Sequence, residues 1–107
     1  MARIAVVPGD GVGHEVMSLA LSVLQVVVRR FELELVFTHF GWGADYYLQT
    51  GIGLPEGGVK QLGENFDSIL FGAVGDPRIP SQVHAREILL GLRFGLDLFI
   101  NLRPCTL

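Results

Sequence analysis

Two arginines near the carboxyl end of the sequence have the chemistry to bind an organic acid. Arg93 lies four residues after Leu89, which is the spacing of neighbours on one helix face, and Arg103 is followed by Pro104. A guanidinium presents its N–H donors as a rigid fork that matches a carboxylate. Leu89 beside Arg93 would suit an acid with an alkyl branch. The alternative is that both arginines pair with Asp or Glu on the surface.

Two glycine-containing loops have the composition to approach a cofactor or an anion. Residues 8–15 (PGDGVGHE) stand between an apolar run and a helical pattern, where the amides of a helix N-terminus bind anions. The spacing does not fit the dinucleotide fingerprint, because His14 stands where the third glycine is needed, and Asp10 would repel phosphate. Residues 75–81 leave the carboxyl end of an apolar run, where ligands of open α/β sheets bind. A structural turn remains the alternative for each loop.

The remaining reactive side chains indicate no further site. His14, His39 and His84 are far apart and lack the spacing of metal ligands, so we expect each to be structural or solvated. Cys105 is the only cysteine and has no internal disulfide partner. A single free cysteine fits a reducing, cytoplasmic location.

Composition excludes several classes of protein. The length of 107 residues corresponds to one domain or part of one. Hydrophobic residues make up 50% of the chain and charged residues 18%, and this composition excludes a disordered chain. A net charge of −3 gives no indication of nucleic-acid binding. The longest uncharged stretch, residues 16–28, is shorter than the roughly 20 residues of a membrane span, so we expect no membrane association. A chain this short and this apolar would leave much apolar surface exposed to water. This suggests that a further segment or subunit completes its core.

The hydrophobic pattern predicts alternating strands and helices. Strands are expected over residues 3–7, 33–38, 66–74 and 98–102, and helices over 13–30, 41–49, 55–64 and 83–94. Short apolar runs that alternate with helices are typical of a parallel sheet with right-handed crossovers. The sequence therefore predicts an α/β layer fold.

Three segments together resemble one known family. AVVPGDGVGHEV (5–16), ILFGAVGDPRIP (69–80) and LLGLRFGLDLFINLRP (89–104) are similar, in the right order, to three motifs of the β-decarboxylating isocitrate/isopropylmalate dehydrogenases. The resemblance implies a three-layer isopropylmalate-dehydrogenase-like α/β fold that is not a Rossmann fold. Residues 1–107 would then be the N-terminal segment of the large domain that binds dinucleotide and substrate.

The resemblance also implies a reaction. Such enzymes use NAD to oxidise a 2-hydroxy acid, and the β-keto acid formed loses CO₂ with Mg²⁺ or Mn²⁺ acting as a Lewis acid. For this sequence 3-isopropylmalate, a substrate of leucine biosynthesis, is the first expectation. Tartrate or D-malate is the alternative within the family, and an anion- or nucleotide-binding fragment without catalysis is the alternative outside it. The parent enzyme is expected to be a homodimer in the cytoplasm.

Matching the family motifs residue by residue gives the site expectations. Arg93 and Arg103 match the carboxylate clamp, and Leu89 matches the position that contacts the alkyl branch. Val12 and the loop Gly75-Asp76-Pro77 match residues beside the dinucleotide.

Other positions depart from the family or match nothing in it. The family's cofactor-loop Glu aligns with Arg86, so no role is transferred to the neighbouring Glu87. Isocitrate is disfavoured, because Leu89 and Glu87 replace a polar Asn and Ser. The catalytic Tyr and Lys, the third arginine and the three metal-binding aspartates match nothing in these 107 residues. The chain alone is therefore expected to be inactive.

Overall fold

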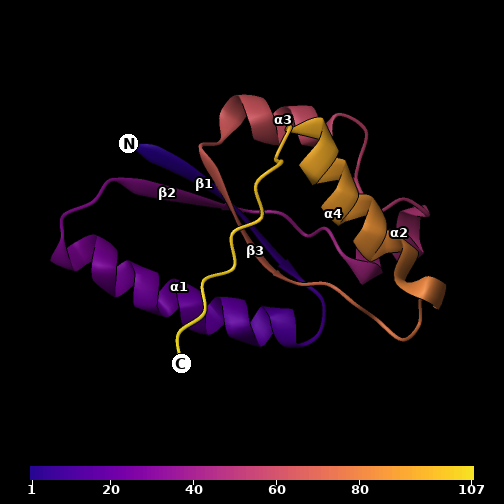
Figure 1. The fold of residues 1–107 in the computed structure, drawn as a ribbon, viewed down its shortest axis with the longest axis horizontal. Helices are drawn as coiled ribbons and strands as arrows, with labels where there is room; N and C mark the ends of the chain where they lie inside the picture. Colours follow the sequence, from indigo (N-terminus) through magenta and orange to yellow (C-terminus); the bar gives the residue numbers. More distant parts are fainter.

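A parallel sheet of three strands forms the centre of the molecule (Figure 1). The computed structural model describes all residues, 1–107. Strand β1 (Ala2–Gly9) lies between β2 (Leu35–His39) and β3 (Ser68–Ala73), in the order β2-β1-β3, and both pairs are parallel. Because β1 is covered on both faces and paired on both sides, its residues Ala5, Val6 and Val7 are fully buried. A continuous apolar run is what such a strand requires.

Helices cover the two faces of the sheet unequally. Helix α1 (Val12–Arg30) lies alone on one face and contacts β1 and β3. Helices α2 (Ala44–Thr50), α3 (Gly58–Asn65) and α4 (Val83–Gly95) lie on the other side, with the short 3₁₀ turn η1 (Pro80–Gln82) before α4 (Figure 1). The result is a three-layer α/β arrangement, as predicted.

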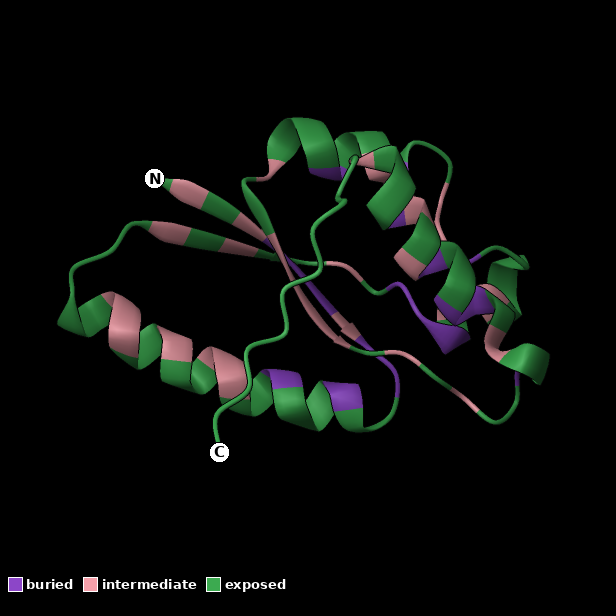
Figure 2. Cartoon of the chain, in the orientation of Figure 1, coloured by how far each residue is buried: buried purple, intermediate pink, exposed green.

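The main core lies between the sheet and the helices opposite α1. Its buried members are apolar side chains of β1, α3 and α4 and of Trp42, which lies two residues before α2. They are Ala5, Val7, Trp42, Leu62, Ile88 and Leu92. Full burial of each large apolar side chain contributes about 1.5–3 kcal/mol. Figure 2 shows that buried residues gather at this interface and at the start of α1. This core holds the carboxyl ends of the strands in place.

Helix α1 is apolar over more of its circumference than the sheet covers. Gly13 and Met17 are buried against the sheet. A second row of apolar residues is more than half exposed, and it consists of Val12, Val16, Leu19, Val23 and Val26. By length and composition alone α1 is also the one helix that could cross a membrane, but in the structure it packs on the sheet.

One predicted element is wrong. Residues 98–102 were expected to form a strand that ends at Arg103, but residues 98–107 form an exposed extended tail (Figure 1). The only backbone hydrogen bond at its start runs from the amide of Leu98 to the carbonyl of Arg93. A strand is stable only when a neighbour satisfies its backbone, and this tail pairs with neither edge of the sheet. Arg103 is therefore not held on a rigid element here.

Candidate functional site

The loops that follow β1 and β3 leave the sheet in opposite directions. After β1 the chain turns through Asp10 and Gly11 into α1, whereas after β3 it runs from Val74 toward α4 on the other face (Figure 1). Ligands of open α/β sheets bind where the loops of adjacent parallel strands part in this way, so the position between these two loops is the expected ligand crevice. This crevice is the candidate site.

The residues predicted to contact the cofactor flank this crevice. Val12 begins α1 on one side, with 61% of its surface exposed. Gly75, Asp76 and Pro77 form the loop on the other side. The two sides are tied together, because the amide of Asp10 donates to the carbonyl of Ala73 at 2.6 Å and the amide of Gly75 donates to Asp10 Oδ2 at 2.9 Å. Two motifs more than 60 residues apart in sequence thus meet at one place.

Glycine allows the backbones at this edge to approach closely. Gly9 has φ +84°, and a Cβ built on it would overlap the carbonyl of Ala73. A Cβ on Gly13 or on Gly72 would overlap the carbonyl of Pro8. The first and third glycines of the 8–15 loop motif, Gly9 and Gly13, and Gly72 in β3 therefore act in backbone packing, which is the structural reading of that loop.

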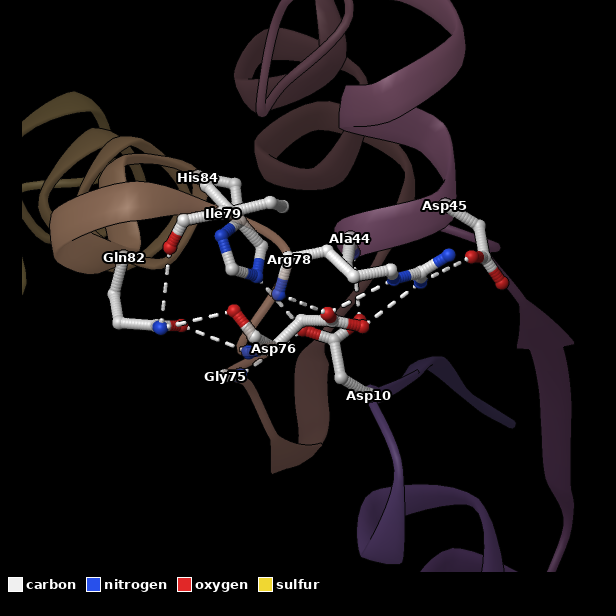
Figure 3. A network of polar contacts seen from close by, with 9 residues as sticks. All are labelled: Asp10, Ala44, Asp45, Gly75, Asp76, Arg78, Ile79, Gln82 and His84. Atoms are coloured by element: carbon white, nitrogen blue, oxygen red, sulfur yellow. Dashed lines mark hydrogen bonds and ion pairs between the residues drawn. The ribbon is translucent and has the colours of Figure 1, made fainter.

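A buried carboxylate lies at the centre of the site (Figure 3). Asp10 is 7% exposed, and its Oδ1 accepts a hydrogen bond from the amide of Ala44 at 2.6 Å. Its Oδ2 accepts from the amide of Gly75 and lies 2.8 Å from Nε2 of His84, which is fully buried. Burial raises the pKa of Asp10, but the two amides and His84 outweigh that effect and hold the pKa below its ordinary value. Asp10 is thus a stable buried anion.

The loop after β3 is fixed at several further points. Arg78 bridges two carboxylates, contacting Asp76 at 2.8 Å and Asp45 of α2 at 2.7 Å. Hydrogen bonds from Arg78 lower the pKa of Asp76 to about 2. The side-chain amide of Gln82 accepts from the amide of Asp76 at 2.8 Å and donates to its carbonyl at 2.9 Å. Ile79 anchors the loop in the interior (Figure 3). The loop is rigid in spite of its glycine and prolines.

A hollow lies on the other side of β1, between the carboxyl ends of β1 and β2. It has a volume of about 270 Å³, and its walls include the two exposed histidines, His14 and His39. No group of three or more His, Cys, Asp or Glu side chains is arranged to hold a metal ion anywhere in the chain. His14 and His39 therefore have no third potential metal ligand beside them.

The residues predicted to bind substrate lie away from the crevice. Leu89 is half-buried and Arg93 exposed in the second half of α4, and nine residues of helix, about 13 Å, separate Arg93 from His84. Arg93 lines a shallow hollow with the first residues of the tail, and just beyond it Arg103 Nε donates to Asn101 Oδ1 at 3.2 Å. The chain therefore brings the two loops predicted to contact the cofactor together and leaves Arg93 and Arg103, which were predicted to bind substrate, exposed to solvent.

Sequence reasoning missed the residues that organise the site. Asp10 and His84 are separated by 74 residues, and nothing in their local sequence links them. One signal in the sequence could have indicated Asp10, because it follows the most apolar strand directly. A carboxylate buried at such a position must accept hydrogen bonds. Glu87, to which no role was assigned, accepts a hydrogen bond from the amide of Gly53 at 2.5 Å and so fixes the turn after α2.

Comparisons with known proteins find one matching family model and many similar sequences. The family model described as isocitrate/isopropylmalate dehydrogenase matches residues 3–107. The 3-isopropylmalate dehydrogenase of Thermobifida fusca is 45% identical over 105 residues, which cover 98% of this chain and 29% of that protein. The 3-isopropylmalate dehydrogenase of Nocardia farcinica is 48% identical over 105 residues, or 98% of this chain and 30% of that protein.

A solved structure agrees as well. The apo crystal structure of a β-decarboxylating dehydrogenase from Thermococcus kodakarensis superposes with a TM-score of 0.71 at 34% identity, covering 92% of this chain and 27% of that one. This chain spans about 30% of the length of the curated relatives that it matches. The match covers nearly the whole sequence, in the order of the three motifs, and the chain belongs to the isocitrate/isopropylmalate dehydrogenase family.

Proposed function

We propose that this chain is the amino-terminal segment of an NAD-dependent decarboxylating dehydrogenase that oxidises 3-isopropylmalate in leucine biosynthesis. The observation that carries the proposal is that Val12 and the Gly75–Pro77 loop, taken from separate motifs, both follow the carboxyl ends of the paired strands β1 and β3, where ligands of open α/β sheets bind. Relatives named 3-isopropylmalate dehydrogenase support the choice of substrate. Tartrate or D-malate is the alternative substrate class.

The residues of the crevice fit a dinucleotide that is held by apolar contact and backbone groups. When bound, NAD supplies the hydride acceptor of the reaction. The exposed side chain of Val12 offers an apolar surface, and the rigid Gly75–Pro77 loop offers the opposite wall. The carboxylate of Asp76 is occupied by Arg78, so this loop contributes its backbone rather than a free charge.

Substrate binding requires residues other than those that lie beside the crevice. In the proposal Arg93 and Arg103 bind the malate carboxylate and Leu89 contacts the alkyl branch. The residues present do not fit Mg²⁺ or Mn²⁺, because no three potential ligands converge in this chain. The metal ligands and the acid–base groups would come from the part of the relatives that has no counterpart here, and homodimerisation and a cytoplasmic location belong to that whole protein.

A chimeric enzyme tests the proposal directly. Residues 3–107 would replace the matching 105 residues of the Thermobifida fusca enzyme, which are 45% identical. We expect the chimera to reduce NAD with 3-isopropylmalate and a divalent metal, and to prefer this acid to tartrate and D-malate. Arg93→Ala and Arg103→Ala should each lower kcat/KM by about 100-fold or more, since each leaves a substrate carboxylate without its charged partner.

The controls separate the substrate assignment from misfolding. Arg30→Ala removes an exposed arginine at the end of α1 and should leave kcat/KM near that of the parent chimera. A folded chimera with no activity on any of the three acids would contradict the proposed function. Full activity of both the Arg93→Ala and the Arg103→Ala chimera would contradict the roles of these two arginines but not the proposed reaction. The purified 107-residue chain should produce no NADH under the same conditions.

A further inference from the structure

We propose that Asp10 and His84 form a clamp that positions the Gly75–Pro77 loop, with His84 acting as a neutral imidazole that donates through Nε2. The inference rests on the proposed function in one respect, because that function gives the loop its ligand. In this proposal neither side chain contacts the ligand. Both act by fixing the loop that does.

The clamp joins the carboxyl ends of all three strands through one side chain. Asp10 follows β1 directly, and its carboxylate accepts hydrogen bonds from Ala44, at the start of the helix after β2, and from Gly75, at the start of the loop after β3. His84 adds a third donor from the first turn of α4 (Figure 3). Gly43 makes room for it, since a Cβ at that position would lie 2.5 Å from Asp10 Oδ1.

The protonation state of His84 follows from its two nitrogens. Nε2 faces a carboxylate oxygen at 2.8 Å, so it carries a proton and donates it. Nδ1 is buried and has no hydrogen-bond partner. A second proton on Nδ1 would create a buried donor without an acceptor, which is costly. The neutral Nε2–H tautomer leaves only a lone pair unsatisfied.

The surroundings of the imidazole agree with a clamp of net charge −1. Asp10 faces it from the end of β1, and the ring of Tyr47 packs against it from α2 at 6.0 Å between centroids. Asp76 is neutralised by Arg78, and Glu87, one turn further along α4, is directed to Gly53. The carboxylate of Asp10 is thus stabilised by three N–H donors rather than by a full positive charge.

The consequence for the loop is that both of its ends are fixed. Gln82 holds Asp76 and Ile79 from the carboxyl side, and the clamp holds Gly75 from the amino side. Without the clamp, Gly75 would be a free glycine hinge next to the crevice. A loop that is ordered in advance loses less conformational entropy when a ligand binds, so the clamp raises affinity without contacting the ligand.

Nitrogen NMR of the unsubstituted chain tests the tautomer without any substitution. In ¹⁵N-labelled protein at pH 7 we expect the His84 ring to show one protonated nitrogen, Nε2, and one unprotonated nitrogen, Nδ1. Protonation of Nδ1, either alone or together with Nε2, would overturn the proposed state of the clamp. This measurement decides the question even if a substituted chain fails to fold.

Amide hydrogen exchange tests the positioning role. His84→Leu fills the interior with an apolar side chain but removes the N–H donor. We expect this substitution to speed exchange of the Gly75 amide at least about tenfold and to leave exchange of the β1 amides unchanged. His84→Gln returns an N–H donor and should restore most of the protection. His39→Leu makes the same chemical change at an exposed histidine and should have no effect on Gly75.

Two results would overturn the positioning role. One is unchanged exchange at Gly75 in the His84→Leu chain, and the other is equal acceleration in β1, which would indicate a general loss of stability. A titration with NAD, read from the amides of Val12 and Gly75, reports separately on the proposed function. If NAD leaves these amides unmoved while the exchange results hold, the dinucleotide assignment fails and the clamp remains.

Discussion

Two separate constraints, the backbone conformation and the space available, require glycine at position 9. Its φ of +84° is unfavourable for a residue with a Cβ, and a Cβ would also overlap the carbonyl of Ala73 in β3. Gly57 has a similar φ of +75° but open space around it. The pair therefore separates backbone strain from steric overlap.

We expect Gly57→Ala to lower the free energy of unfolding by about 1 kcal/mol, and Gly9→Ala to lower it by several times as much. Urea unfolding followed by circular dichroism gives both values. Equal losses would show that β1 and β3 can separate at Gly9 without cost, contrary to the packing described.

Carboxylates with lowered pKa values make the chain sensitive to acid. Hydrogen bonds from Arg78 lower the pKa of Asp76 to about 2, and the pKa of Asp10 is also below its ordinary value of 3.8. Such groups contribute stability above their unfolded-state pKa, and the contribution is lost as pH falls toward the folded-state value. We expect the free energy of unfolding to fall between about pH 4 and pH 2.

Substitution of Arg78 isolates the share of this pH dependence that belongs to Asp76. Arg78→Gln should lower stability at pH 7 and flatten its fall between pH 4 and pH 2, as measured by urea unfolding at each pH. Lys60→Gln removes the exposed Lys60–Glu64 pair and should leave the profile unchanged. A steeper profile in the Arg78→Gln chain would contradict the assignment.

At the scale of elements, α1 has two apolar faces and only one of them meets the sheet. The exposed row from Val12 to Val26 repeats at intervals of four and three residues, which keeps it on one side of the helix. An exposed row of this length promotes association with other apolar surfaces. It also accounts for much of the excess apolar composition.

We expect the double substitution Leu19→Lys and Val23→Lys to reduce self-association while changing the free energy of unfolding by less than about 1 kcal/mol, because both side chains are mostly exposed. Sedimentation velocity and urea unfolding measure the two effects. Met17→Lys, two residues away on the buried face, should instead destabilise the chain strongly. Strong destabilisation by the double substitution would show that the row is already packed.

The sequence predicted the elements well where local pattern decides them. Strands β1, β2 and β3 and the helices α1, α3 and α4 lie within three residues of the predicted limits, since hydrophobic periodicity sets them. Helix α2 also lies within three residues of its predicted limits, and it begins at Ala44 rather than at residue 41 because Trp42, in the non-helical segment before it, enters the core. The tail at 98–102 has a strand's composition, but pairing depends on a partner that local sequence does not show.

The candidate site was predictable only in part, for the same reason. The two loops were identified from glycine and proline content and from their position after apolar runs. That Asp10 binds Ala44, Gly75 and His84 depends on how three distant segments pack, and no spacing rule contains that information.

The whole molecule is less compact than its length would allow. Its radius of gyration is 14.7 Å, against about 13 Å for a compact domain of this size, and 18 of 107 residues are buried. The exposed tail and the uncovered side of α1 contribute to this. Much of the apolar surface thus lies outside the core between the sheet and α4.

We expect brief chymotrypsin digestion to cut first at Phe99 or Leu102 in the tail, because these residues are more than three-quarters exposed and lie outside regular structure. Mass spectrometry identifies the first products. Phe71, which lies in β3, should be cut only after global unfolding. Early cleavage at Phe71 with an intact tail would contradict the structure.

The central position of β1 also determines when this protein can take shape during its synthesis. The three groups that Asp10 binds lie 34, 65 and 74 residues further along the chain. At 5–20 residues per second, the ribosome adds His84 roughly 4–15 s after Asp10. β3 ends at Ala73, so for most of that interval β1 has at most β2 as a neighbour, and its most apolar residues stay incompletely covered until the last segments of the sheet layer are made.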